Sequence, residues 1–422
     1  MPDHKINRRD FLGTAAGTAA FLAVSPSRVL GANDRVRVGM IGVGGRGTEL
    51  LGQVLKVPNA ELVAIADIYS RHRDHAQQLA PGIRTLNDHR RLLEMKDIDA
   101  VIVATPLHCH ARHFLDVIAA GKDLYCEKTM TWSMSEAEQC RQTALNSKQV
   151  VQVGTQWASF GSVTDARKWI ADGLVGKIAQ IDMWMGRNTP HGQGQWVRSV
   201  PSDCTAANVN WDAFLNGRKA RPFDAYKFMN WRLFWEFSGG NLTENMVHQV
   251  SWIMKVLDLP VPTAAYMSGG VFSEKDGREV PDTISVTMDF PNDMVVTWQS
   301  RFNNAHFGLG QRLLGSDGAV EYASGENDMV RGTSGRSRSG VFYFPEPKNR
   351  PNGVELTGEA PDQNHMANFI DCVRSRQTPN APVELGYRSA MAAHMANVAY
   401  RNRQRVTPES ARVLADKEDR YA

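Results

Sequence analysis

The sequence predicts two domains of different classes. The first is an α/β domain with a parallel sheet, and the second is an α+β domain with a large, mostly antiparallel open sheet. A glycine-rich turn, Gly42-x-Gly44-x-x-Gly47, joins an apolar run to a helix-forming run, and strand and helix patterns then alternate to about residue 154. Beyond residue 155, several runs alternate apolar and polar residues, which is the period of half-buried strands.

The composition is that of an ordinary globular protein. With 422 residues, 42% of them hydrophobic and 22% charged, the chain is long enough for two domains that each bury a core. A net charge of +3 is small for this length and argues against nucleic acid as the main partner. The five cysteines are odd in number and scattered, without a Cys-x-x-Cys pair, so neither a disulfide framework nor a cysteine zinc site is expected.

The N-terminal 32 residues have the pattern of an export signal. Arg8 and Arg9 precede Phe11-Leu12 and a mildly apolar run over residues 13–24, which resembles a twin-arginine signal peptide. The run is shorter than the ~20 apolar residues of a membrane span. We therefore expect a twin-arginine signal over residues 1–32 and a periplasmic or secreted protein without stable membrane insertion. The alternative is a disordered basic tail, because paired arginines also occur by chance.

The glycine turn predicts a dinucleotide site in a Rossmann domain over residues 34–154. Its first glycine permits the sharp turn, its second lets a pyrophosphate approach the backbone, and its third lets the helix pack on the strand. A second predicted strand ends at Asp67, 20 residues after Gly47, where a carboxylate that binds the ribose belongs. The predicted cofactor-binding residues of this region are Gly42, Gly44, Gly45, Arg46, Gly47 and Asp67.

The carboxylate of Asp67 also predicts which cofactor binds. It can accept hydrogen bonds from both ribose hydroxyls and repels a 2′-phosphate, so NAD is expected. Arg71 and Arg73 lie close in sequence and could weaken this preference, which leaves NADP as the alternative.

The remaining elements follow in order. In the first domain we expect strands at 97–104, 122–126 and 149–153, and helices at 112–120 and 135–146. In the second domain, over residues 155–360, we expect a helix at 162–172, a strand at 178–185, a hairpin of 282–290 and 294–300, and an irregular excursion over 325–359. Residues 361–422 are expected to form helices, at 364–376 and 387–401, that pack near the domain junction.

Several motifs resemble one family. They are the glycine turn, Ala104-Thr-Pro106 with His110, Cys126-Glu-Lys128, Gly239 to His248, and the segments starting at Asn368 and Gly386. The chain from Val36 to Arg405 resembles the glucose–fructose oxidoreductase, inositol dehydrogenase and rhizopine-catabolism (Gfo/Idh/MocA) family. The resemblance implies cofactor-binding roles for Thr105, Pro106, His110, Glu127 and Lys128.

This family includes sugar and polyol dehydrogenases, oxidoreductases that keep their cofactor, reductases and some glycoside-cleaving enzymes. The chain departs from the family pattern twice. Thr129 stands where proline usually follows the lysine, which leaves a cis peptide there open. Glu244 replaces the usual aspartate four positions before the histidine.

Three residues are the predicted catalytic group. Glu244 and His248 are four positions apart, on the same face of a predicted helix. Hydride transfer from a carbinol needs a group that takes the hydroxyl proton, and we assign His248 as this general base. Glu244 would orient the imidazole or bind a substrate hydroxyl. Lys128 follows a parallel strand and could share or take the role of base.

Aromatic residues upstream of Glu244 predict a carbohydrate site. Tryptophan faces stack on sugar rings, and arginine donates directional hydrogen bonds to hydroxyls. The predicted substrate-binding residues are Trp196, Trp211, Trp231 and Arg232. No metal is expected at His108-Cys109-His110, because no carboxylate or cysteine cluster completes a ligand set.

These observations together predict an exported NAD(P)-dependent oxidoreductase that acts on a sugar, polyol or glycoside. The twin-arginine route carries folded proteins, and no pool of free nicotinamide cofactor exists outside the inner membrane, so we expect a tightly bound cofactor that is recycled within the cycle. One alternative is an NAD-dependent glycoside hydrolase or lyase that oxidises the sugar transiently. Another is a non-catalytic sugar-binding protein. The exposed face of the second sheet is expected to form a homo-oligomer, as in the family.

Overall fold

The computed structural model describes residues 35–323 and 340–419, and side chains as far as residue 415. The predicted signal peptide lies outside these residues. Within them, no helix is both long and apolar enough to cross a membrane.

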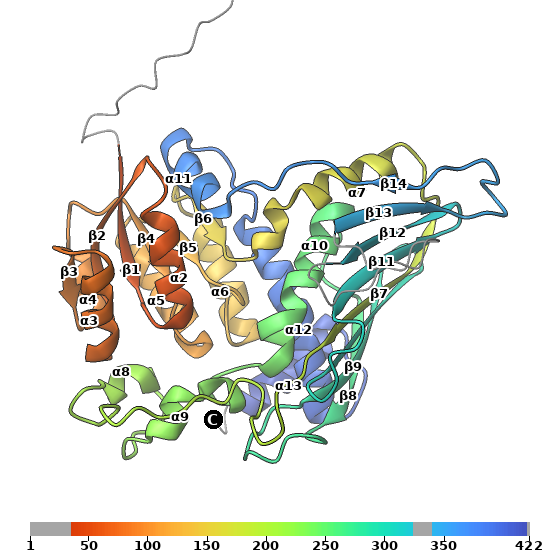
Figure 1. Ribbon diagram of the computed structural model, residues 1–422. Helices are drawn as coiled ribbons and strands as arrows, with labels where there is room; N and C mark the ends of the chain where they lie inside the picture. Colours follow the sequence, from red (N-terminus) through yellow and green to blue (C-terminus); the bar gives the residue numbers. More distant parts are fainter. Residues whose placement is uncertain (1–34, 324–339, 420–422) are drawn as a thin grey trace, which may run out of the picture. The chain divides into compact units, whose positions relative to one another are not determined.

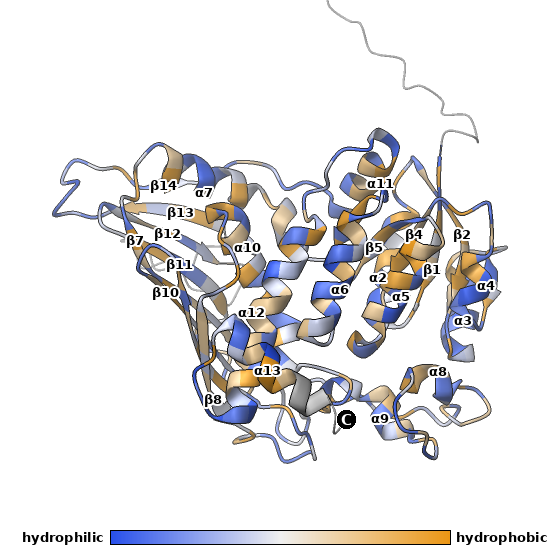
Figure 2. Cartoon of the chain, turned by 180° about the vertical axis from the view of Figure 1, so that it is seen from behind, coloured by the Kyte–Doolittle hydropathy of each residue, from blue (hydrophilic) through white to orange (hydrophobic). Residues whose placement is uncertain are grey.

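The first domain contains a six-stranded parallel sheet with the strand order β3-β2-β1-β4-β5-β6. Strands β4 and β5 are buried along their whole length, as expected for a sheet that helices cover on both faces. In Figure 2 the strand β1 is coloured mainly as hydrophobic and the surface helix α3 mainly as hydrophilic. The strands are β1 (Val36–Ile41), β2 (Ala60–Ala66), β3 (Arg84–Leu86), β4 (Ala100–Val103), β5 (Asp123–Cys126) and β6 (Val151–Val153). The helices are α2 (Gly45–Val54), α3 (Ser70–Leu79), α4 (His89–Leu93), α5 (His110–Ala119) and α6 (Met134–Leu145).

The second domain contains an eight-stranded sheet with the order β14-β13-β12-β11-β7-β10-β9-β8 (Figure 1). Within the described part of this sheet, β7–β10 is the only parallel pair and the other neighbours are antiparallel, so the predicted fold class is confirmed. The strands are β7 (Ile178–Gly186), β8 (Ala264–Gly270), β9 (Thr283–Phe290), β10 (Met294–Arg301), β11 (Leu309–Gly315), β12 (Gly318–Ala323), β13 (Gly340–Pro345) and β14 (Leu356–Thr357).

One prediction about this sheet is wrong. The segment 325–359 is expected to be irregular, but its described part contains β13, which pairs with β12 from Gly318↔Pro345 to Ala323↔Gly340. The apolar residues of β13, Val341, Phe342 and Tyr343, are buried. Burial of this short apolar run outweighs the turn-rich composition that surrounds it.

The two domains share one hydrophobic core. A single cluster of buried side chains runs from Ile41 and Val103 in the first domain, through the helices α10 and α12, to Val286 and Trp298 in the second sheet. The helix α11 instead packs in a second cluster with β1 and α2 of the first domain. The other helices are α7 (Gly161–Ala171), α8 (Trp211–Leu215), α9 (Ala225–Met229), α10 (Val247–Leu257), α11 (His365–Ser375), α12 (Val383–Asn402) and α13 (Pro408–Asp419), with one π-helical turn at Leu242–Met246.

A segment between β7 and the π turn reaches back to the first domain. We call residues 196–237 the strap; it carries α8 and α9, which lie beside one end of the first domain (Figures 1 and 2). Its backbone bonds to the corner after β2, where Asn210 N donates to Ile68 O at 3.0 Å and Ser70 N donates to Asn208 O at 3.0 Å. Tyr69 is fully buried among aromatic residues of the strap. The strap therefore forms one wall over the carboxyl ends of the parallel strands.

Candidate functional site

The glycine turn has the geometry that a bound pyrophosphate requires. Gly42 has a φ of +86°, and a Cβ there would lie 2.8 Å from the carbonyl oxygen of Ala104. A Cβ on Gly47 would overlap the carbonyl oxygen of Gly42, so the third glycine permits the close packing of α2 on β1. No acidic residue lies in the first turn of α2, so its N-terminus is free to attract an anion.

The substitution Gly47→Ala is expected to abolish retention of nucleotide. The added methyl group would collide with rigid backbone, so the turn must open and its amide groups lose their common direction. The measurement is the amount of nucleotide that the purified variant releases on denaturation. Gly52→Ala on the same helix is the control, because no atom lies within 4 Å of the added methyl group and the variant should hold nucleotide like the wild type.

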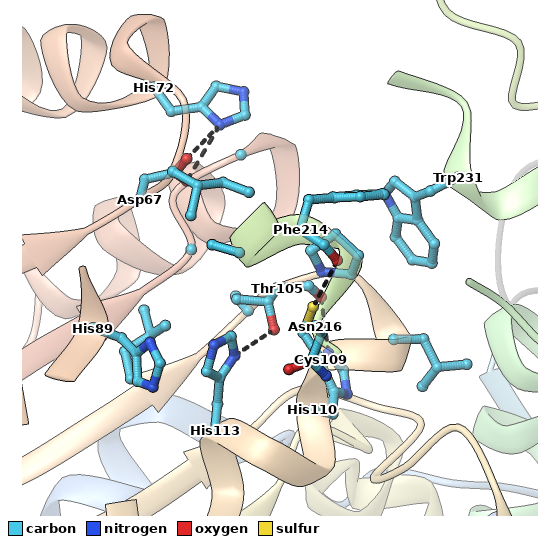
Figure 3. Close-up of a pocket in the computed structure, with 18 of the residues that line it drawn as sticks. Asp67, His72, His89, Thr105, Cys109, His110, His113, Phe214, Asn216 and Trp231 are labelled. Carbon is cyan, nitrogen blue, oxygen red and sulfur yellow. Dashed lines mark hydrogen bonds and ion pairs between the residues drawn. The ribbon is translucent and has the colours of Figure 1, made fainter. Parts of the chain in front are cut away.

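Asp67 lies at the end of β2 and faces the glycine turn. Its Oδ2 accepts from Val43 N at 2.8 Å, its Oδ1 accepts from Tyr69 N at 2.9 Å, and His72 Nδ1 lies 3.2 Å from both oxygens (Figure 3). These contacts fix the carboxylate at the mouth of the site. A carboxylate in this position can accept from ribose hydroxyls.

The two arginines after Asp67 have different hydrogen-bond partners. Arg73 NH1 donates to the Asp67 carbonyl oxygen at 2.8 Å, and Arg71 Nε donates to Asp203 of the strap at 3.0 Å. Arg71 is thus held by the strap, whereas Arg73 stays beside Asp67; the carboxylate favours NAD, and NADP stays the alternative.

A cavity of about 480 Å³ extends from the glycine turn to the strap. Its volume lies within the range of about 300–1,000 Å³ that is usual for ligand sites. Strand ends of the first domain form one side and strap residues the other, as the labelled Thr105, Phe214 and Trp231 show in Figure 3. The predicted residues that line it are Gly42, Gly44, Gly45, Arg46, Asp67, Thr105, Pro106, His110, Glu127, Lys128, Trp231, Arg232 and Glu244. The cavity thus contains both the glycine turn, which can bind a pyrophosphate, and Asp67, which can bind a ribose, and this combination fits a dinucleotide.

Lys128 and Glu244 meet across the domain boundary in this cavity. Lys128 Nζ donates to the Glu244 carbonyl oxygen at 2.9 Å and lies 3.3 Å from its Oε2. Arg232 Nε donates to the same Oε2 at 3.0 Å. Burial would raise the pKa of Glu244, but the two cations lower it to about 2. The carboxylate is therefore ionised at neutral pH.

The turn at Thr129 is fixed by the same part of the second domain. The peptide bond between Lys128 and Thr129 is cis, although threonine replaces the usual proline. Thr129 Oγ1 donates to the Thr243 carbonyl oxygen at 2.7 Å. Two adjacent side chains, Lys128 and Thr129, thus bind two adjacent carbonyl groups of the π turn. Proline could not make the bond that Thr129 makes.

The sequence predicts Glu244 and His248 on one face of an α-helix. In the structure Glu244 lies in the π turn, and His248 lies in α10, which follows it. Its ring stacks on Trp157, with centroids 5.8 Å apart, and it does not line the cavity. Its Nδ1 is buried without a hydrogen-bond partner among the described residues, so Glu244 does not orient it through this nitrogen. Burial lowers the pKa of His248 well below its usual value, and Lys128 and Arg46 add to the effect. The ring is therefore neutral at pH 7 and a weaker base than a free imidazole.

Arg46, Glu127 and His110 support the cavity wall. Arg46 Nε donates to Glu127 Oε1 at 2.9 Å, which joins the glycine turn to the end of β5. His110 lies between two backbone oxygens, with Nδ1 2.7 Å from Thr129 O and Nε2 2.8 Å from Thr105 O. His110 therefore fixes the loops that carry Thr105 and Lys128. Within the described residues no three His, Cys, Asp or Glu side chains gather as a metal site.

The tryptophan predictions need correction. Trp231 lines the cavity, and the Arg232 guanidinium lies 4.3 Å from the centre of its ring. Trp211 is instead buried in the strap, stacked on Phe214 and bonded through Nε1 to Arg221 O. Trp196 packs edge-on against Phe302 and does not line the cavity. Both rings serve packing because the strap needs an aromatic core of its own.

Sequence reasoning missed several residues of the cavity wall. Arg198, Asn210, Phe214 and Asn216 come from the strap, and His72 and His113 from the first domain. The aromatic density of the strap indicates a functional region, but no sequence pattern pairs Asn210 with the corner after β2.

Comparisons with known proteins identify both domains. Residues 36–155 match the model of the oxidoreductase family with an NAD-binding Rossmann fold, and residues 213–321 match the GFO/IDH/MocA C-terminal domain. Similar solved structures include scyllo-inositol dehydrogenase from Lactobacillus casei with bound NAD(H) and scyllo-inositol, with a TM-score of 0.63 and 15% identity, covering 89% of this chain and 100% of that one. Another is aldose-aldose oxidoreductase from Caulobacter crescentus, with a TM-score of 0.64 and 18% identity, covering 88% and 99%.

Proteins that are similar in sequence include a glycosyl hydrolase family 109 protein from Shewanella baltica. It is 32% identical over 171 residues, which are 33% of this chain and 37% of that protein, so the match spans little more than a third of the relative. An uncharacterized oxidoreductase from Streptococcus pneumoniae is 23% identical over 68% of each chain. With both of its domains matched by models of one family and its fold shared with solved members, the chain belongs to the Gfo/Idh/MocA oxidoreductases and has their NAD-binding Rossmann domain.

Proposed function

We propose that this protein is an exported NAD(P)-dependent oxidoreductase that acts on a sugar, polyol or glycoside and keeps its cofactor tightly bound. The observation that supports it best is the position of Lys128. This lysine lies in the same cavity as the glycine turn, at the carboxyl end of β5, with an ionised carboxylate beside it. That is where a substrate hydroxyl must meet a proton acceptor.

The residues of the site divide the work. The bound nicotinamide supplies the acceptor of the hydride. Glu244 holds Lys128 in place and can accept a hydrogen bond from a substrate hydroxyl, while Arg232 and Trp231 offer a donor and a ring face to a sugar. Lys128 takes the hydroxyl proton in its neutral form or stabilises the developing oxyanion in its charged form. The sequence also predicts His248 as a general base, but its ring does not line the cavity and its lowered pKa makes it a weak proton acceptor. We therefore assign the proton to Lys128 and keep His248 as the alternative base.

A glycoside hydrolase is the second candidate function. The glycosyl hydrolase family 109 relatives favour it, as does an alpha-N-acetylgalactosaminidase from Shewanella oneidensis, 32% identical over 172 residues and 37% of its length. The same proton acceptor would serve a transient oxidation that ends in cleavage of the glycoside, without net redox change.

Export and assembly complete the proposal. The pattern over residues 1–32 supports a twin-arginine signal and a periplasmic or secreted location. The alternating exposure of β9 and β10 gives the second sheet an outer face that supports a homo-oligomer.

The test starts from protein purified from the periplasm. Denaturation is expected to release about one nicotinamide nucleotide per chain, identified by mass spectrometry with its redox state. The loaded protein is then incubated with sugars, polyols and aryl glycosides. Oxidised product with a second carbonyl compound as acceptor supports the oxidoreductase, and released aglycone without an acceptor supports the hydrolase. Protein that contains no nucleotide and takes up none would refute both.

A further inference from the structure

We propose that Arg198 of the strap binds the pyrophosphate of the cofactor, so that the second domain completes the dinucleotide site. The inference rests on the proposed function, since it assumes that the glycine turn holds a dinucleotide. Arg198 lies outside the Rossmann domain, in a segment that the glycine motif does not include.

The position of the guanidinium group is the first argument. Arg198 lines the cavity, and its NH1 and NH2 atoms lie 3.4 and 3.5 Å from the place where a Cβ on Gly45 would be. Gly45 is the first residue of α2, the helix whose N-terminus faces the phosphate in this fold. The guanidinium group therefore lies beside the N-terminus of α2, and both face the same cavity.

The charge balance of the cavity is the second argument. Its other lysine and arginine side chains all form ion pairs: Arg46 with Glu127, Arg90 with Asp88, Arg112 with Asp116, and Lys128 and Arg232 with Glu244. Among the described residues, the guanidinium group of Arg198 has neither an ion pair nor a hydrogen bond. An arginine that presents its donors to a cavity without a protein partner is suited to bind a phosphate with two of them.

The backbone around Arg198 is fixed although its side chain is unpaired. Arg198 N donates to Asn230 Oδ1 at 2.6 Å, and Asn230 Nδ2 donates to Arg198 O at 3.2 Å. Asn230 is itself buried at the end of α9. The strap therefore holds the base of the side chain at a set distance from the glycine turn, which lowers the entropy cost of binding an anion.

A closed strap would also slow the escape of the nucleotide. The strap bonds to the corner after Asp67 and also carries Arg198, which lies close to Gly45 of the glycine turn. Release of the dinucleotide then requires the arginine contact to break. The proposed function needs a tightly bound cofactor, and the contact from Arg198 would be a physical cause of that tight binding in the second domain.

The experiment compares exchange of bound nucleotide in the wild type, Arg198→Met, Arg198→Lys and Arg167→Met. Each purified protein, in its native loaded state, is mixed with excess isotopically labelled NAD, and the label bound is followed with time. Arg167 is an exposed arginine that bonds to Lys255 O outside the cavity, and its variant should exchange like the wild type. Circular dichroism checks that all four proteins are folded.

Arg198→Met is expected to exchange about 10–100-fold faster than the wild type, the range of one charge-assisted contact, and Arg198→Lys should fall between them. An unchanged exchange rate in Arg198→Met overturns the inference. So does a rise in the KM of the substrate alone, which would place the anion on the substrate instead. Wild-type protein without any nucleotide would overturn the proposed function, and is recognised before the variants are compared.

Discussion

Replacement of Lys128 by methionine is expected to lower kcat by about 10²–10⁴-fold, the usual loss when a general acid–base group is removed. Methionine matches the lysine side chain as far as Cε but neither accepts nor donates the substrate proton. The variant should still release a full complement of nucleotide on denaturation, because the glycine turn and Asp67 are untouched. The measurements are steady-state turnover of the substrate identified in the panel and the bound nucleotide per chain.

Lys255→Met is the matched control for this variant. Lys255 is also a partly buried lysine that donates to a backbone oxygen, that of Asn380, at 2.8 Å, but it lies outside the cavity. It should turn over substrate like the wild type. Full activity in Lys128→Met would move the chemistry to His248, whereas a loaded wild-type protein that turns over no compound of the panel would favour the non-catalytic sugar-binding protein.

Glu244→Gln is expected to destabilise the protein by about 3–5 kcal/mol, because it leaves two cations in a largely buried site without their common anion. The side chain of Glu244 is only 10% exposed, so water compensates little. Urea unfolding monitored by tryptophan fluorescence measures the loss. The double variant Glu244→Gln/Lys128→Met should lose less stability than the sum of the two single variants, since it removes a cation together with the anion.

The same carboxylate predicts a pH dependence of stability. The pKa of Glu244 is lowered to about 2 in the folded protein, from 4.5 for a free carboxyl. Its contribution is therefore fully present above about pH 4.5 and is lost as the pH falls through about 2. The stability gap between wild type and Glu244→Gln should narrow over this interval. A gap that stays constant down to pH 2 would contradict the ion pairs described here.

The parts of the molecule that were predictable from sequence are those with local causes. The glycine turn, the burial of β4 and β5, and the hairpin of β9 and β10 each follow from residues that are neighbours in the chain. Gly42 and Asp67 belong to strand ends, and parallel topology alone brings strand ends together.

The parts that were not predictable depend on contacts between distant segments. Nothing in the sequence around Asn210 indicates that it will bond to Ile68, and the apolar run at 341–343 becomes a strand only because β12 offers it an edge. The spacing of Glu244 and His248 suggests a shared helix face. In the structure Glu244 lies in the π turn and forms ion pairs with Lys128 and Arg232 instead of contacting His248. Arg198 belongs to no sequence motif, and only its position close to Gly45 in the folded chain indicates that it could bind the cofactor.

The bonds from Lys128 and Thr129 to the π turn limit how this protein can be recombined. Its Rossmann domain and its second domain are not interchangeable modules, although each matches a separate family model. A chimera that joins this Rossmann domain to the second domain of a relative would keep the glycine turn, but Lys128 and Thr129 would then depend on where the relative's backbone places the matching carbonyl groups. Grafts intended to change the substrate should therefore carry residues 128–129 and 242–246 as one unit.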